Sequence, residues 1–330
     1  MKIFVALIAI VVVFVLAGAV VRTTYYTKRF AQITPYGELV AVGDGKMHVF
    51  FMGNGGKTVV LLPGMGVALP SADFGPLMRK LSEKYTVVSV EYFGVGFSSE
   101  TARERSCENY TEEIRAALAA AGFAPPYVLM PHSISSVYSE YYASKYPEEI
   151  EAMVSLDGTS TAYYERMPSF LKYVLPIAKF QQAIGLTSVI GPLTVNKANL
   201  LSKGYTEKEI SDMAVFVGFS INDTLLAQMA ESSEFIRQAM EHPFPSDIPY
   251  LKIIARDTYE TSNPQLKKAG LTPQQYQEDH LSRIGEHAKY EVLDGNHFVY
   301  LNNVDRIAEI TDAVLQPQAI FCMEGGVLSD

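Results

Sequence analysis

Ser133 lies where a buried strand meets a helix, and its position suits a nucleophile. Residues 127–130 form a short apolar run, a small polar cluster follows, and residues 137–145 favour a helix. A serine on such a sharp turn presents its hydroxyl clear of the sheet, with the next backbone N–H groups facing the same space. The pattern predicts a nucleophilic serine and not a packed one. The alternative is a serine-rich turn without a catalytic role, which would show the same pattern after a buried strand.

His297 lies in a glycine turn, residues 294–298, between the last predicted strand and the last predicted helix. If this strand and the strand before Ser133 are parallel, both side chains reach the same edge of the sheet. A histidine there could take the proton of the serine hydroxyl, which is the chemistry of a nucleophilic triad. The alternative is an ordinary surface histidine.

A triad also needs a carboxylate that holds the histidine in the correct tautomer. Two aspartates follow predicted strands: Asp157 comes after residues 152–156, and Asp257 comes after residues 250–255. Spacing alone does not choose between them. Asp157 could equally cap a helix, because it opens an Asp-Gly-Thr-Ser segment.

The elements that must position these residues alternate between strands and helices. Such alternation predicts an α/β fold with a mostly parallel sheet covered on both faces. Two β-prone runs around a glycine-rich turn predict an antiparallel hairpin at the sheet edge. The eight expected strands are residues 38–42, 47–52, 58–62, 86–91, 127–130, 152–156, 250–255 and 289–293.

One interval breaks this alternation. About 90 residues separate the strands 152–156 and 250–255, far more than an ordinary connection needs. Helical periodicity and a capping box at residues 206–209 predict that residues 158–245 form an inserted helical cap over the strand ends. The α/β core would then comprise residues 36–157 and 246–315, followed by a tail, residues 316–330.

The first 35 residues are expected to form a transmembrane anchor and a juxtamembrane linker. Residues 3–21 carry no charge, and at ~1.5 Å per residue they reach about 28 Å, close to the thickness of a hydrocarbon core. A cleaved signal peptide is the alternative, since residues 17–19 have a small-x-small form. We expect a single-pass membrane protein whose catalytic domain is extracytoplasmic, although the flanking charges favour the opposite orientation by three to two.

Composition limits the choice of partners. The formal net charge of −9, from 27 basic and 36 acidic residues, disfavours nucleic acid because phosphate binding needs a basic face. The two cysteines form no Cys-x-x-Cys pair, and no His-Glu-x-x-His, P-loop or dinucleotide-binding motif occurs. We therefore expect no metal, no nucleotide and no other cofactor.

Four motifs resemble those of the α/β-hydrolases, and they occur in that family's order over residues 36–315. The elbow, PHSIS, has the form small-x-Ser-x-small, and DGNHF resembles the segment of the catalytic histidine. LPGMG resembles the His-Gly-x-Gly loop and EYFGVGFS the Asp-x-x-Gly-x-Gly-x-Ser loop. The chain looks most similar to capped members such as proline iminopeptidases, esterases and cofactor-free haloperoxidases. The motifs are residues 62–66, 91–98, 131–135 and 294–298.

The resemblance implies roles for particular residues. Ser133 would be the nucleophile and His297 the base, and the family location after the strand that follows the cap favours Asp257 as the acid, with Asp157 as its rival. The backbone N–H groups of Met65 and Ile134 would form the oxyanion hole.

These roles predict a membrane-anchored serine hydrolase that cleaves a small-molecule ester, amide or peptide substrate through an acyl-enzyme. The alternative is a non-catalytic binding protein on the same scaffold. It is motivated by departures from the family pattern at Pro63, Pro131 and Ala255.

Overall fold

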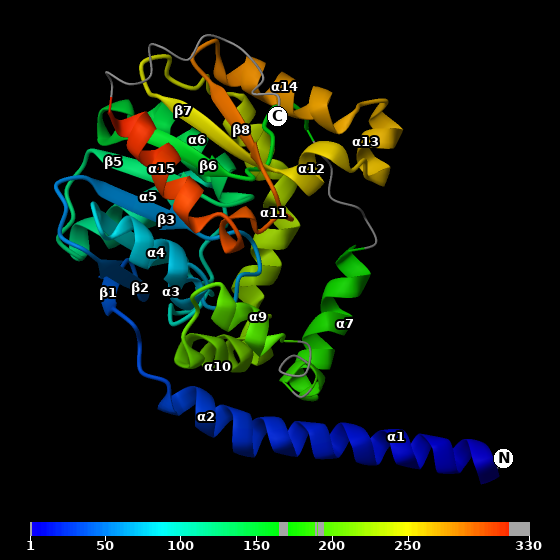
Figure 1. The fold of residues 1–330 in the computed structure, drawn as a ribbon. Helices are drawn as coiled ribbons and strands as arrows, with labels where there is room; N and C mark the ends of the chain where they lie inside the picture. Colours follow the sequence, from blue (N-terminus) through cyan, green and yellow to red (C-terminus); the bar gives the residue numbers. More distant parts are fainter. Residues whose placement is uncertain (1, 165–170, 189, 191–194, 317–330) are drawn as a thin grey trace.

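A twisted eight-stranded sheet forms the centre of the molecule (Figure 1). The computed structural model describes residues 2–164, 171–188, 190 and 195–316, without the side chains of residues 2, 3, 5–8, 11, 171–173 and 175. The strand order is β1-β2-β4-β3-β5-β6-β7-β8, and every pairing is parallel except β1 with β2 and β2 with β4. The predicted mostly parallel α/β sheet is therefore confirmed. Only β1 of the hairpin is outermost, because β2 pairs on its other side with β4.

The strands lie close to their predicted positions. The largest differences are in β2 and β6, which each begin two residues before the predicted strand. The strands are β1 (Glu38–Val42), β2 (Gly45–Met52), β3 (Thr58–Leu62), β4 (Thr86–Glu91), β5 (Tyr127–Pro131), β6 (Ile150–Leu156), β7 (Tyr250–Ala255) and β8 (Lys289–Leu293).

Both faces of the sheet are buried, and β3 shows how. Successive side chains of a strand point to opposite faces. Val60 and Leu62 pack with residues of α5, α6, α11 and α14 on one face, whereas Val59 and Leu61 pack with residues of α4 and α15 on the other. A strand buried on both sides must be apolar throughout, which is why the central strands lack an alternating pattern.

Helices and short helical turns connect these strands. Outside the segment between β6 and β7, they are α3 (Pro70–Asp73), α4 (Gly75–Leu81), α5 (Cys107–Ala120), α6 (Ser135–Lys145), η2 (Pro147–Glu149), α12 (Arg256–Glu260), α13 (Pro264–Ala269), α14 (Pro273–Ile284), η4 (Val299–Leu301) and α15 (Val304–Leu315).

The segment between β6 and β7 is helical in its described part, and we call residues 158–245 the cap. Residues 165–170, 189 and 191–194 of the cap and residues 317–330 of the predicted tail lie outside the described residues. The predicted capping box is present: Thr206 accepts from the Glu209 N–H, and the Glu209 side chain accepts from the Thr206 N–H. The cap elements are α7 (Leu171–Ala183), α9 (Lys197–Ser202), α10 (Glu207–Phe216), η3 (Val217–Phe219) and α11 (Asp223–Met240).

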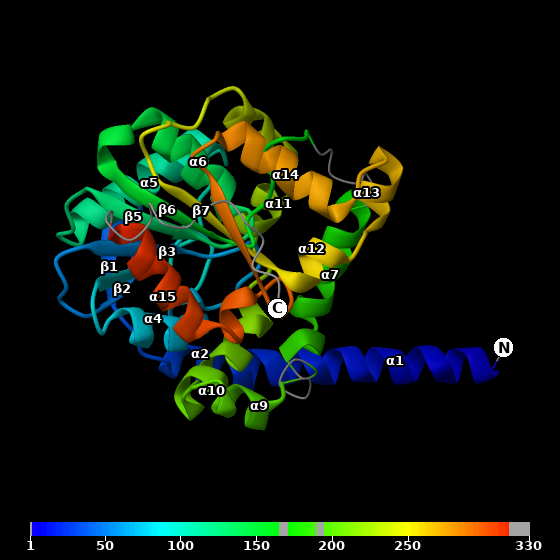
Figure 2. The ribbon, with the colours of Figure 1, turned by 45° about the horizontal axis from the view of Figure 1, so that its top comes forward.

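The N-terminal residues form one long helical arm that leaves the α/β domain beside the cap (Figures 1 and 2). It consists of α1 (Lys2–Val21), a π-helical turn η1 (Arg22–Tyr26) and α2 (Thr27–Gln32). Across the described residues, no single helix combines the length and apolar character of a membrane span. Residues 207–219 and 223–240, bent by 79°, reach these limits only as a pair.

Candidate active site

Ser133 occupies a strained turn between β5 and α6. Its φ of 56° lies in the left-handed region, which costs energy for any residue with a Cβ and is common at functional turns. Three main-chain hydrogen bonds hold the turn. The Ser133 N–H donates to the Leu156 carbonyl at 3.1 Å, the His132 N–H donates to the Leu62 carbonyl at 2.9 Å, and the Thr159 N–H donates to the Ser133 carbonyl at 3.1 Å. The neighbouring strands β3 and β6 therefore fix the turn and direct the Ser133 side chain.

A continuous chain of hydrogen bonds runs from Ser133 through His297 to a carboxylate. The Ser133 Oγ lies 2.8 Å from His297 Nε2, and His297 Nδ1 lies 2.7 Å from Asp157 Oδ2. The Asp157 carboxylate is buried, whereas the histidine is partly open to solvent. Ser133 and His297 thus meet as the sequence predicted, and the geometry is that of a nucleophile, a base and an orienting acid.

The prediction that Asp257 is the acid is wrong for this arrangement, because Asp157 occupies its place. Asp157 directly follows β6 and has a φ of 45°, so the backbone turns sharply and directs the carboxylate under His297. Its Oδ1 accepts from the Ala255 N–H at 2.9 Å, and its Oδ2 also accepts from the Thr258 hydroxyl at 2.7 Å. These donors hold the carboxylate in a fixed orientation.

Asp257 lies one strand further along the sheet, in the first turn of α12. It is exposed, and its N–H donates to the Gly295 carbonyl at 3.1 Å. It lines a pocket of about 530 Å³ that His297 also lines, together with Thr258 and Tyr276. The sequence signal that could have favoured Asp157 as the acid is the Asp157-Gly158 pair, because aspartate tolerates a positive φ better than most residues.

His132 is a further residue of the site whose role the sequence did not reveal. Its Nε2 lies 2.9 Å from the His297 carbonyl oxygen, so this nitrogen carries the proton and donates. Its ring lies 4.8 Å from the His297 ring, and the side chain is buried. Burial and the neighbouring His297 lower the His132 pKa to about 4. A neutral His132 therefore ties the elbow to the loop that carries the base.

The loop after β3 passes directly over the elbow. A Cβ placed on Gly64 would lie 2.6 Å from His132 Nδ1 and 3.1 Å from the Ser133 Cβ, so only glycine allows this approach. The Ser135 hydroxyl donates to the Pro63 carbonyl, which fastens the loop to α6. Among the described residues, no hydrogen-bond acceptor pairs with the N–H of Met65 or of Ile134. Both groups are therefore free donors near Ser133.

A buried charged cluster lies under the site, between α6, β7 and α14. Lys252 Nζ donates to His280 Nδ1 at 2.7 Å, and His280 Nε2 donates to Glu140 Oε1 at 3.0 Å. Arg283 also approaches Glu140, at 3.4 Å. Because Lys252 donates to one ring nitrogen, His280 is neutral. Burial and the Lys252 charge lower its pKa to about 4.

The two buried histidines predict a loss of stability in mild acid. Their folded pKa of about 4 lies below the unfolded value near 6.5, so between these values the unfolded chain binds more protons and stability falls as pH falls. From pH 7 to pH 5 each histidine costs about 2 kcal/mol. Asp73, whose pKa burial raises to about 6, offsets about 1 kcal/mol. Urea unfolding at both pH values measures the difference, and equal or greater stability at pH 5 would contradict the prediction.

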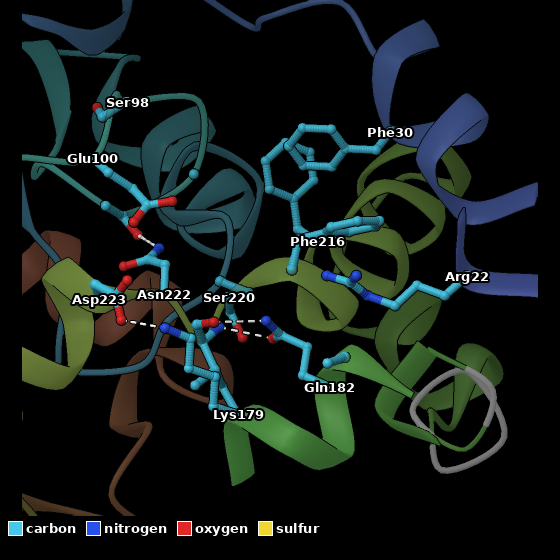
Figure 3. A pocket seen from close by; sticks show the side chains of 16 residues that line it. Arg22, Phe30, Ser98, Glu100, Lys179, Gln182, Phe216, Ser220, Asn222 and Asp223 are labelled. Atoms are coloured by element: carbon cyan, nitrogen blue, oxygen red, sulfur yellow. Dashed lines mark hydrogen bonds and ion pairs between the residues drawn. The ribbon is translucent and has the colours of Figure 1, made fainter. Parts of the chain in front are cut away.

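A second pocket, of about 440 Å³, lies between the cap, the N-terminal arm and the loop after β4 (Figure 3). Phe30 and Phe216 form an apolar wall, and Arg22 enters from the arm. Gln182 of α7 holds the backbone of Ile221, donating to its carbonyl at 2.6 Å and accepting from its N–H at 2.8 Å. The cap, the arm and the core thus meet around this pocket.

Comparisons with known proteins agree with the fold. Residues 57–181 match a family model described as the alpha/beta hydrolase fold. The chain is 27% identical over 317 residues to the uncharacterized protein YbdG of Bacillus subtilis, covering 94% of each chain. It is 31% identical over 96 residues to a 2-(acetamidomethylene)succinate hydrolase of Mesorhizobium japonicum, covering 28% of this chain and 34% of that protein.

Solved structures share the fold at low sequence identity. Cfl2 of Burkholderia cenocepacia is 16% identical with a TM-score of 0.63, over 84% of this chain and 95% of that one. The carboxylesterase CesB of Bacillus subtilis is 15% identical with a TM-score of 0.56, over 91% of this chain and 99% of that one. With its mostly parallel sheet, its serine elbow and its match to this family model over residues 57–181, the chain has the α/β-hydrolase fold.

Proposed function

We propose that the protein is a serine hydrolase that cleaves an ester or amide bond of a small molecule through an acyl-enzyme. The observation that carries the proposal is the hydrogen-bond chain from Ser133 through His297 to Asp157. The arrangement joins a buried carboxylate, a partly exposed histidine and a serine in a strained turn. Apolar contacts at the same place would stabilise the fold at least as well, so stability does not explain the arrangement.

The geometry assigns each proton. Ser133 Oγ attacks the carbonyl carbon while its proton moves to His297 Nε2, and Asp157 stabilises the imidazolium through the Nδ1–H hydrogen bond. The imidazolium then protonates the leaving alcohol or amine as its bond to the carbonyl carbon breaks. A water molecule then attacks the acyl carbon and gives a proton to His297 Nε2. The bond from the acyl carbon to Ser133 Oγ breaks, and His297 returns this proton to Oγ as the acid leaves.

The developing oxyanion requires donors that are already in place. The unpaired N–H groups of Met65 and Ile134 suit this role, because a preorganised donor costs no reorganisation when charge develops. Since the donors are main-chain groups, proline at position 63 does not remove them. The departures from the family motif at Pro63 and Pro131 are thus compatible with catalysis.

A fluorophosphonate probe tests the proposal on the full-length protein. The probe should form a covalent adduct on Ser133, and a panel of esters, thioesters and aminoacyl amides should include a substrate. No adduct together with no hydrolysis of any member would refute the enzyme and leave a non-catalytic binding protein on this scaffold.

Replacing Gly64 with alanine is expected to lower kcat by about 10², because the new Cβ would push the loop of Met65 away from the elbow. Gly56→Ala is the matched control, since a Cβ there meets nothing within 4 Å. Steady-state kinetics on one ester and the melting temperature should separate the two variants. Equal kcat values in both would exclude the Met65 N–H as an oxyanion donor.

The proposed hydrolase is anchored in a membrane by α1. The helix contains the uncharged run of residues 3–21, and most of its described apolar side chains, among them Phe14 and Leu16, are exposed. Burying such a surface in a bilayer is favourable because it removes apolar area from water. Tyr25 and Tyr26 then lie at the boundary, where aromatic residues are enriched.

Membrane fractionation tests the anchor and its direction. The protein should stay in the membrane pellet after alkaline carbonate extraction, whereas a peripheral protein would be released. We propose an extracytoplasmic catalytic domain, so protease added to intact cells should remove it. A domain that survives intact cells but is degraded after permeabilisation would reverse the orientation.

A further inference from the structure

The cap helix α7 carries several exposed apolar side chains. Val174, Ile177 and Phe180 are 42%, 56% and 58% exposed. Gln182, by contrast, is buried and holds the Ile221 backbone, and Lys179 pairs with Asp223 at the start of α11 (Figure 3). A helix at a water-exposed surface normally places its apolar side chains inward. The outward face of α7 therefore suits an apolar surrounding.

The residues directly after α7 touch the proposed membrane anchor. A Cβ on Gly18 of α1 would lie 2.3 Å from the Ile184 carbonyl oxygen, and a Cβ on Gly185 would lie 2.4 Å from the Gly18 carbonyl oxygen. Two glycines thus let the end of α7 touch the backbone of α1, as small residues do where membrane helices cross. In both ribbon views, α7 stands away from the sheet with its C-terminal end on α1 (Figures 1 and 2).

The level of the contact along α1 indicates how deep α7 would lie. Gly18 precedes Arg22, the first charge after the apolar run, by four residues, which is about 6 Å along a helix. Beyond this level, the Arg22 guanidinium lies over the Phe219 ring at 4.8 Å. The end of α7 therefore meets α1 just inside the boundary between acyl chains and headgroups.

We infer that α7 lies in the outer part of the lipid bilayer beside α1, with Val174, Ile177 and Phe180 among the acyl chains. The partner is the lipid surface itself. The inference rests on the proposed anchoring of α1 and adds that the cap is a membrane-contacting element. Exposed apolar side chains on α1 and on the helix whose end touches it are the kind of surface that marks membrane contact.

Depth-dependent fluorescence quenching tests this inference on the full chain in phosphatidylcholine vesicles. Cysteine is introduced at Ile177 or Phe180 in a Cys322→Ser background and labelled with an environment-sensitive fluorophore. Cys107 is buried and should stay unlabelled. Phe14→Cys reports on α1, and Tyr290→Cys on β8 is the matched control, being 41% exposed and distant in sequence. Labelling by the fluorophosphonate probe checks that each variant is folded.

Nitroxide lipids labelled near the headgroup should quench fluorophores at positions 177 and 180, and nitroxides near the chain end should quench position 14. Aqueous iodide should quench position 290 alone. If nitroxide lipids quench position 14 but iodide quenches positions 177 and 180, the inference about α7 is wrong and the proposed anchor α1 is retained. If neither quencher reaches positions 177 and 180, the inference is also wrong, and a second copy of this chain covers α7 instead of lipid. No lipid quenching at position 14 would instead overturn the anchor, and this inference with it.

Discussion

Ser133→Ala is expected to lower kcat by about 10⁶ while leaving the fold intact, because a triad nucleophile carries a contribution of this size. Alanine keeps the Cβ, so the strain of the left-handed turn is the same in both proteins. Among the described residues, the lost hydroxyl forms a hydrogen bond only with His297. Purified variant protein should have an unchanged melting temperature and should take up no fluorophosphonate.

Ser144→Ala is the matched control for this change. Ser144 lies near the end of α6, and its hydroxyl donates to the Tyr141 carbonyl within the helix. The Ser144→Ala variant should retain full activity. Hydrolysis by Ser133→Ala at a rate near that of the unchanged protein would remove Ser133 from the mechanism.

Asp157→Asn is expected to lower kcat by about 10⁴. The Ala255 N–H requires the asparagine oxygen at the Oδ1 position, so the amide NH₂ group faces His297 Nδ1. That donor forces His297 to present a lone pair at Nδ1 and its proton at Nε2. The imidazole then cannot accept the Ser133 proton, although the shape of the site is preserved.

Asp257→Asn should by contrast remain active, within a few-fold of the unchanged protein, because this exposed carboxylate does not contact His297. The pair is matched in chemistry and differs in position by one strand. Measurement of kcat and of fluorophosphonate labelling rates for both variants decides the assignment. If Asp257→Asn is inactive and Asp157→Asn is active, Asp257 is the acid and reaches His297 in another conformation.

The sequence predicted the elements of this site because the information is local. The apolar strand, the small polar cluster and the helix around Ser133 specify an elbow within about fifteen residues. The glycine turn of His297 is equally local, and the alternation of strands and helices restricts the sheet to parallel connections. The shared position of Ser133 and His297 at one sheet edge followed from these patterns.

The choice of the acid depended on tertiary structure. Strands β6 and β7 are parallel neighbours, so Asp157 and Asp257 leave the same edge of the sheet one strand apart. Only the φ of 45° at Asp157 and the three donors around its carboxylate bring that side chain under His297. Spacing along the chain carries none of this information.

The contacts around the triad were also invisible in the sequence. The hydrogen bond from His132 to the His297 backbone joins residues 165 positions apart, and the pair of His280 and Glu140 spans 140. The approach of Gly18 to Gly185 places α7 on α1. Composition and periodicity determined which segments are strands, helices and turns. The packing of distant segments determined which polar groups meet, because a hydrogen bond needs its partners within about 3 Å whatever their separation in the chain.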